Sequence, residues 1–250
     1  METNRILRVN SKFRESGTAC DFTYSLGDNI VATRIIELTL VSARVPRMFG
    51  NMYYPINQMD FMREGELVSM FVPEGQYTAL TLSTAMSAIM VDLGVDVSYD
   101  VAMHLFVFVA RSTPVTLLVT SPIAAYIGLL KDTLLTNSPV SMQAQPTLDG
   151  PNCVYLQSND LSRSLHCVDS RRVGTYIPLI AVIPCDVPYG FTINYECRDV
   201  LAQQVSYRLS ESYPNLTMFD LQLCDQYGNV LSMQENSYCD FVFKITVSMS

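Results

Sequence analysis

The sequence of 250 residues has no tryptophan and only two histidines, His104 and His166. Histidine is the side chain that titrates near neutral pH, so few residues are available for acid–base catalysis. His166 precedes Cys167 directly. In an extended segment neighbouring side chains point to opposite faces, so these two could not form a nucleophile and base pair. We therefore predict no catalytic residues and no enzymatic activity.

Short-spaced cysteine pairs are also missing. The seven cysteines contain no C-x-x-C motif, which argues against a zinc site because structural zinc needs four convergent ligands. No glycine-rich loop opens a helix either, which argues against phosphate binding. We predict no metal and no cofactor, and we expect reduced thiols that fill core space. The cysteines are Cys20, Cys153, Cys167, Cys185, Cys197, Cys224 and Cys239.

Long apolar runs are absent. The longest stretch, around residues 101 to 110, contains His104 and is shorter than the ~18 residues that a membrane helix needs. The first residues, METNR, are polar and no apolar segment follows them, so we expect no secretory leader and synthesis in the cytosol. Charged residues make up only 16% of the chain against 49% hydrophobic residues, which leaves apolar surface for partners.

Positive charge is scarce as well. The chain has 16 Lys and Arg against 24 Asp and Glu, a net charge of -8, which argues against direct nucleic-acid binding. The first fifteen residues are the exception, because they carry +2 and leave -10 for the remainder. We predict a basic N-terminal arm over residues 1–20 that docks on a neighbouring subunit; a solvated terminus is the alternative. The residues predicted to dock are Arg5, Leu7, Arg8, Lys12, Phe13 and Arg14.

Alternating apolar residues and turn signals indicate strands along most of the remaining chain. One helix is predicted over residues 78–93, where Leu82, Met86, Ile89 and Leu93 share a face and Gly94 follows. The predicted strands cover residues 21–26, 34–45, 51–56, 67–72, 97–109, 115–120, 153–157, 176–183, 189–195, 216–224 and 238–247.

Three local features carry specific expectations. Over residues 97–109 the odd positions form a core face, and Phe106 and Phe108 on the even face suggest cover by a neighbouring molecule. Residues 225–229 predict a hairpin turn in which Gly228 takes a positive φ. Residues 136–152 predict a surface loop within one domain, so that residues 21–250 form a single antiparallel β-sandwich of the jelly-roll or Greek-key type.

Six segments in this order resemble a known family. They are RVNSKFRESGTACDFTYSL at 8–26, IIELTLVSARVP at 35–46, VPEGQYT at 72–78, YLQSNDL at 155–161, YIPLIAVIP at 176–184 and LQLCDQYGNVL at 221–231. The pattern resembles the single jelly-roll penton and minor capsid proteins of nucleocytoplasmic large DNA viruses, of the iridovirus-like kind. The chain departs from this pattern at Cys239–Phe241, where we expect an aromatic residue such as tryptophan at the start of the last strand.

The resemblance implies a structural protein of an icosahedral virion, made in the host cytoplasm. It implies a homopentamer at the five-fold vertices, with the major capsid protein and other minor capsid proteins as further partners. A lattice protein beneath the major capsid shell is the alternative within the family. A receptor- or carbohydrate-binding β-sandwich is the alternative outside it, because fourteen tyrosines could stack on sugars even without tryptophan.

Overall fold

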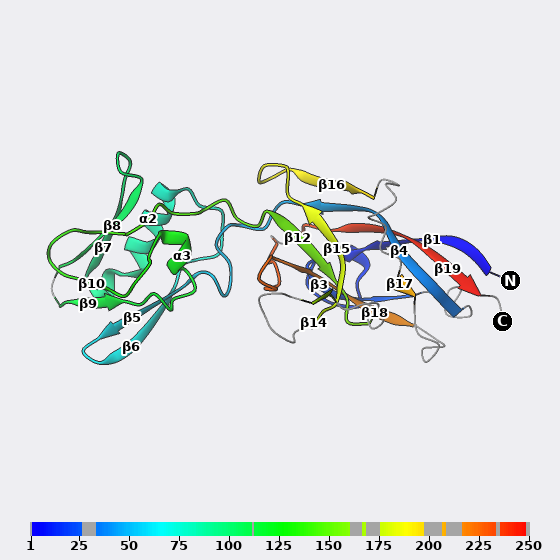
Figure 1. Ribbon diagram of the computed structural model, residues 1–250, viewed down its shortest axis with the longest axis horizontal. Helices are drawn as coiled ribbons and strands as arrows, with labels where there is room; N and C mark the ends of the chain where they lie inside the picture. The colour runs from blue at the N-terminus through cyan, green and yellow to red at the C-terminus, as the bar shows by residue number, and fades with distance from the viewer. Residues whose placement is uncertain are drawn as a thin grey trace. The chain divides into compact units, whose positions relative to one another are not determined.

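The computed structural model describes residues 2–26, 34–111, 113–160, 167–168, 176–197, 207–208, 217–233 and 236–248. The chain forms two compact units, one from residues 1–49 and 151–250 and the other from residues 50–150 (Figure 1). The prediction of a single domain over residues 21–250 is therefore wrong. The chain leaves the first unit at Phe49 and returns to it at Pro151, so the second unit is an insertion.

The first unit contains an antiparallel sheet with the strand order β1-β19-β4-β16. Its strands are β1 (Glu2–Asn10), β19 (Asp240–Ser248), β4 (Arg34–Pro46) and β16 (Thr192–Glu196). A two-residue strand, β17 (Tyr207–Arg208), also pairs with β4. Nine residues of β1 pair with β19, which places β1 at one edge of the sheet and β16 at the opposite edge.

The second sheet of this unit has the order β15-β12-β18-β3-β2. Its strands are β15 (Leu179–Pro184), β12 (Cys153–Gln157), β18 (Met218–Cys224), β3 (Asp21–Ser25) and β2 (Ser16–Gly17). A short ladder joins β13 (Cys167–Val168) to β14 (Tyr176–Ile177).

Together the two sheets have the strand order of a jelly roll. Eight described strands of this unit are five residues or longer, and one sheet joins the first, eighth, third and sixth of them in chain order. The other sheet joins the second, seventh, fourth and fifth. This arrangement of two interleaved Greek keys confirms the predicted all-β sandwich. The inserted unit occupies the connection between the third strand, β4, and the fourth, β12.

Period-two alternation builds the core of the jelly roll. Phe241, Phe243, Ile245 and Val247 of β19 are all completely buried, as their alternation predicts. Leu7 and Val9 of β1 pair with Phe243 and Phe241 and are also buried. The inner face of β18 adds Phe219, Leu221 and Leu223. The space between the sheets is thus filled by apolar side chains.

Asp220 on β18 fastens the connection that follows β12. Its carboxylate accepts hydrogen bonds from Ser158 Oγ (2.9 Å), the Asn159 backbone and side chain (3.1 and 2.9 Å) and the Asp160 backbone (2.9 Å). Burial alone raises the pKa of this carboxyl, but these hydrogen bonds outweigh it and hold the pKa below 3.8. The charged form is therefore the one that the fold stabilises.

We expect Asp220→Asn to lower the free energy of unfolding at pH 7 by about 1–3 kcal/mol, because an amide cannot accept as many hydrogen bonds. A folded-state pKa below the unfolded one means that this stability is present above about pH 4 and is lost as the pH falls through the folded value. Urea unfolding of the wild type and the variant at pH 7 and pH 3 measures this difference in the free energy of unfolding. A difference as large at pH 3 as at pH 7 would contradict the stabilising role of the charged carboxylate.

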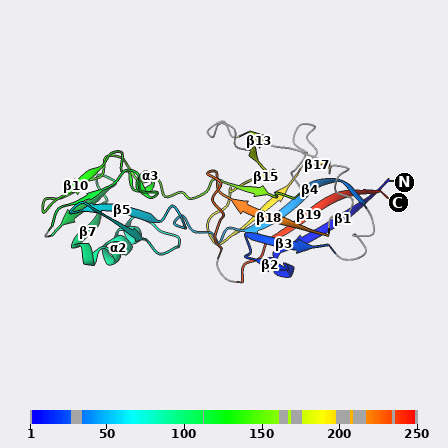
Figure 2. The same ribbon diagram turned by 90° about the horizontal axis from the view of Figure 1, so that it is seen from below.

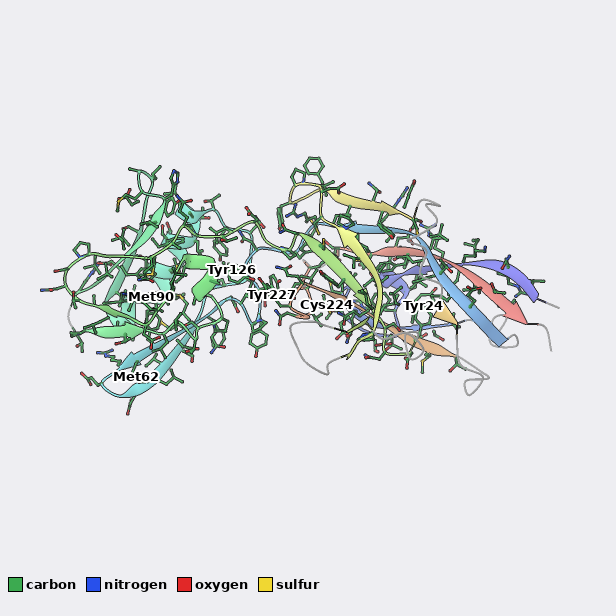
Figure 3. All side chains as sticks on the ribbon, viewed as in Figure 1. Tyr24, Met62, Met90, Tyr126, Cys224 and Tyr227 are labelled. Carbon is green, nitrogen blue, oxygen red and sulfur yellow. The ribbon has the colours of Figure 1, made fainter. Side chains whose placement is uncertain are left out.

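The inserted unit has its own core between two small sheets and a helix. One sheet has the order β10-β9-β5-β6 and the other β11-β8-β7. The elements are β5 (Gln58–Arg63), β6 (Glu66–Phe71), β9 (Val115–Leu117), β10 (Thr133–Leu135), β7 (Val95–Asp100), β8 (Leu105–Ala110), β11 (Val140–Ser141), α2 (Ala79–Ile89), the 3-10 turn η2 (Val91–Leu93) and α3 (Ala124–Ile127). Met90, which ends α2, and Tyr126 of α3 both pack in this core (Figure 3).

Helix α2 confirms the predicted helix. Thr78 begins it with a capping box, in which its side chain accepts from the Thr81 backbone and the Thr81 side chain bonds back. Leu82 and Met86 are buried on the predicted face. Gly94 ends the following 3-10 turn in the left-handed conformation, with φ 65°. No helix within the described ranges is long and apolar enough to cross a membrane.

The strand predicted over residues 97–109 is a hairpin of β7 and β8. Asp100 Oδ1 accepts from the backbone of Ala102 (2.8 Å) and Met103 (3.0 Å), which turns the chain, and His104 has φ 56°. The turn reverses which positions face inward, so Phe106 and Phe108 are completely buried in the unit's own core. The expectation that a neighbour covers them is wrong. Part of the surface loop predicted over residues 136–152 is also ordered, as β11 and buried Met142.

Candidate functional site

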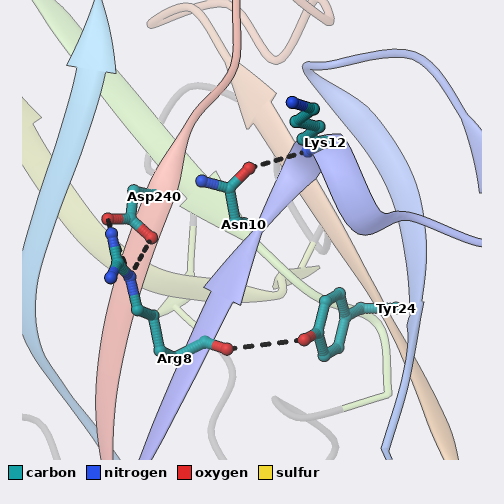
Figure 4. A network of polar contacts seen from close by, with 5 residues as sticks. All are labelled: Arg8, Asn10, Lys12, Tyr24 and Asp240. Atoms are coloured by element: carbon teal, nitrogen blue, oxygen red, sulfur yellow. Dashed lines mark hydrogen bonds and ion pairs between the residues drawn. The ribbon is translucent and has the colours of Figure 1, made fainter.

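The N-terminal segment forms one edge of the jelly roll. Arg8 projects from β1 and makes a bidentate ion pair with Asp240 of β19, with Nε–Oδ1 at 2.9 Å and Nη2–Oδ2 at 2.6 Å (Figure 4). This hydrogen-bonded carboxylate raises the pKa of the Arg8 guanidinium. Tyr24 Oη of β3 donates to the Arg8 carbonyl oxygen at 3.4 Å. The edge strand is thus fastened to both sheets.

A single 3-10 turn, η1 (Ser11–Phe13), continues this edge from β1 to β2. Asn10 Oδ1 accepts from the Lys12 backbone at 2.9 Å and caps the turn (Figure 4). The Lys12 ammonium lies 5.9 Å from the centre of the Tyr238 ring. The Phe13 side chain is 69% exposed, so η1 presents an aromatic ring and a cation side by side.

These positions correct the prediction of a basic arm over residues 1–20. Leu7 is 6% exposed and lies in the jelly-roll core, so it is not available to a partner. Ser11 Oγ accepts from the Cys239 backbone at 2.8 Å, and the Ser11 backbone donates to the Cys239 carbonyl at 2.9 Å. The prediction failed because the buried partners of this segment belong to the last strand, more than 200 residues away in the sequence.

The other predicted docking residues differ in how far the fold holds them. Arg8 is held by Asp240, and Arg14 donates to the carbonyl oxygens of Gly17 and Ser11, both at 2.8 Å. Arg5 is half-buried on β1. Lys12 and Phe13 remain exposed. We call the turn η1 (Ser11–Phe13), with its exposed Lys12 and Phe13 side chains, the knob.

A groove lies at the opposite edge of the jelly roll, beside β16. It has a volume of about 380 Å³ and is open to solvent. Burial and the neighbouring Cys197 raise the pKa of Tyr195 in its wall. Within the described part of the chain, its lining contains two acidic side chains and no basic one. The lining residues are Pro184, Asp186, Ile193, Asn194, Tyr195 and Glu196.

The loop between β15 and β16 shapes the groove. The Arg47 guanidinium donates to the Val187 carbonyl oxygen, and the backbones of Arg47 and Phe191 are hydrogen-bonded at 2.8 Å. The sequence pattern did not reveal this site, because it predicted one continuous strand over residues 189–195. The strand begins only at Thr192, and Phe191 is exposed. The acidic residues on either side of this segment were the signal that could have indicated a binding edge.

The inserted unit has an apolar row on the outer face of its four-stranded sheet. Leu134 of β10 pairs with Thr116 of β9, Thr116 with Met62 of β5, and Met62 with Leu67 of β6. Leu134, Met62 and Leu67 are all exposed. The row has an exposed apolar side chain on three of the four strands and the half-buried Thr116 on the fourth.

The described residues bring together no three His, Cys, Asp or Glu side chains that could hold a metal ion. His104 lies in the turn between β7 and β8, with its Nδ1 3.3 Å from Tyr99 Oη. His166 lies outside the described residues. Cys20, Cys224 and Cys239 are buried, as predicted for core thiols, whereas Cys153, Cys185 and Cys197 are half-buried.

We expect iodoacetamide at pH 8 to leave Cys20 and Cys224 unmodified in the folded protein. Burial raises the pKa of both thiols to about 12, so almost no thiolate is present. Burial also raises the pKa of Cys239 well above its ordinary value. Peptide mass mapping with and without urea measures the labelling. Rapid native modification of these three cysteines would contradict their placement in the core.

Comparisons with known proteins find similar solved structures but no similar sequence. No protein-family model matches the chain, and no curated protein sequence matches it. The crystal structure of the mavirus penton protein is similar over 99% of this chain and 100% of that chain, with 10% identity and a TM-score of 0.48. A cryo-EM structure of the Sputnik virophage is similar over 97% of each chain, with 13% identity and a TM-score of 0.42.

Proposed function

We propose that this chain is a structural subunit of an icosahedral virus shell, and specifically a penton protein that forms a homopentamer at the five-fold vertices. The observation that carries the proposal is the jelly-roll strand order, whose edge strands lie on opposite sides of one sandwich. Jelly rolls occur in viral capsid proteins, lectins and cupins. The remaining features of the chain favour the first of these.

The surface supports assembly. Ile6, Phe13, Phe191 and Met218 of the jelly-roll unit are large apolar side chains that are exposed in the single subunit. The apolar row of the inserted unit adds a second such surface. Charged side chains, which normally keep a monomer apart from its copies, make up only 16% of the sequence. A subunit of a shell requires apolar surface of this kind on more than one side.

The interior supports a structural rather than a catalytic role. A cupin would place metal ligands between its sheets, whereas the buried side chains on the described strands of these sheets are apolar apart from Thr39 and Gln157. In this proposal the chain works in the virion, its first partner is its own copy, and the apolar row contacts the major capsid protein or another minor capsid protein. Placement in a large DNA virus follows from the sequence resemblance described above.

The proposal is tested by the molar mass of the purified full-length chain, measured by light scattering from 1 µM to the highest soluble concentration, together with a glycan array. We expect a mass near five times the 28.0 kDa of one chain and no glycan binding. A monomer at every concentration that binds a defined glycan would instead identify a carbohydrate-binding sandwich.

A further inference from the structure

The two edges of the jelly roll differ in shape and charge in a complementary way. We propose that the knob of one copy inserts into the β16 groove of the next copy, so that Phe13 fills the groove and Lys12 pairs with Asp186 and Glu196. This inference rests on the proposed function and adds to it the contact that joins the subunits. The partner is a second copy of this chain.

Position in the fold supports this pairing. The knob lies between β1 and β2, which are the outer strands of the two sheets on one side of the sandwich. The groove is lined by residues of β16 and by Pro184 at the end of β15, which are the outer strands on the other side. Figure 2 shows β2 and β15 at opposite margins of the sandwich. A contact between different surfaces on opposite sides repeats from copy to copy, and the proposed five-fold ring requires that the rotation between neighbouring copies is one fifth of a turn.

Charge also supports it. Residues 1–15 and the paired Asp240 hold four basic side chains against Glu2, Glu15 and Asp240, which leaves +1 at the knob edge. The groove contributes two carboxylates from its rim, and no basic side chain lines it within the described residues. Neither Lys12 nor the carboxylates of Asp186 and Glu196 form an intramolecular salt bridge among the described residues. They are therefore available to pair with each other across an interface.

The sizes agree as well. The groove of about 380 Å³ is large enough for one phenyl ring, and Pro184, Ile193 and Tyr195 give it an apolar wall. Phe13 is among the most exposed aromatic side chains of the described chain, at 69%. An aromatic anchor in a pocket with charges around it is the usual composition of the energetically dominant part of an interface. Burying this ring removes an exposed apolar surface that the monomer cannot cover.

The test uses the full-length chain and three groups of variants. Phe13→Asp should raise the concentration needed for ring formation about 30-fold, the effect of losing one strong interface anchor. Phe71→Asp is the matched control, since Phe71 is an exposed phenylalanine of β6 in the inserted unit. It should assemble as the wild type does. Thermal melts should be unchanged in both variants because neither ring is in a core.

Charge exchange tests the pairing itself. Lys12→Glu and Glu196→Lys should each weaken assembly, and the double variant K12E/E196K should restore it in part, because positions 12 and 196 again carry opposite charges while Asp186 is unchanged. Phe13→Asp chains keep an intact groove, and D186K/E196K chains keep an intact knob. A mixture of the two can therefore form only one intact contact per pair of chains. The mixture should therefore form dimers and no closed rings.

The outcomes distinguish the two proposals. Two results would overturn the knob and groove contact and leave the proposed function standing. One is that Phe13→Asp chains form rings at the same concentration as the wild type. The other is that the double variant K12E/E196K assembles no better than either single variant. Equal disruption by Phe71→Asp, or closed rings in the mixture, would also overturn it. A wild type that stays monomeric would overturn both proposals.

Discussion

Deletion of residues 1–15 is expected to unfold the jelly-roll unit. The deletion removes the whole of β1, whose nine residues pair with β19, together with the buried side chains of Leu7 and Val9. Burying each of these two side chains contributes about 1.5–3 kcal/mol, and the lost strand also exposes the edge of β19. A domain is typically stable by only ~5–15 kcal/mol, so the loss takes most of that stability.

Circular dichroism and limited proteolysis measure this loss. The inserted unit, residues 50–150, has a core of its own and should remain protease-resistant in the truncated chain. Leu7→Asn is a milder form of the same change, and Ile6→Asn on the exposed face of the same strand is its control. A truncated chain that melts at the wild-type temperature would show that residues 1–15 are an arm after all.

Replacing Phe243 by alanine is expected to lower the free energy of unfolding by about 3–5 kcal/mol. Phe243 is completely buried between Leu7 and Leu40, its partners on β1 and β4, so the substitution leaves a cavity at the centre of the sheet. Phe13→Ala is the matched control and should change stability by less than about 0.5 kcal/mol. Urea unfolding measures both. Similar values for the two variants would place Phe243 outside the core.

In an assembly assay performed below the melting temperature, Phe13→Ala should have the larger effect of the two variants, although it has the smaller effect on stability. Phe13→Ala should impair self-association although the subunit is stable, because its ring lies on the surface. This separation of stability from association distinguishes a core residue from an interface residue. Loss of association that only follows loss of stability would argue against a role for Phe13 between subunits.

Local patterns in the sequence predicted the local structure well. The alternation in β19, the capped helix α2 and the turn at Gly228, which has φ 83°, all depend on residues close together in the chain. In the turn, Asp225 Oδ1 accepts from the backbones of Tyr227 (2.7 Å) and Asn229 (2.8 Å). Such features need no knowledge of distant partners, and the predictions were confirmed.

Features that depend on distant contacts were not predictable in the same way. The basic residues at the N-terminus indicated a free arm, but Arg8 is paired with a carboxylate 232 residues away. The insertion was missed because both units consist of short alternating strands, so no change of pattern marks the boundary. Gly50, the first residue of the inserted unit, makes a tight contact within that unit, since a Cβ on Gly50 would lie 2.1 Å from the Gly75 carbonyl oxygen. Such a contact is visible only in three dimensions.

The groove belongs to the same group of features. Asp186 and Glu196 are ten residues apart in the sequence and come together only because the loop after β15 turns back to β16. The apolar row of the inserted unit likewise needs the register of four strands before Leu134 and Leu67 fall in one line. The proposed interaction sites are surfaces built from several elements, and a linear pattern does not contain such surfaces.

Negative-stain class averages of the purified full-length chain test the central claim most directly, because they show whether copies of the subunit close into a ring. The account predicts closed rings with five-fold symmetry, in which each jelly-roll unit contacts its neighbours through opposite edges. Single particles of one subunit at all concentrations, or open chains that do not close, would contradict it.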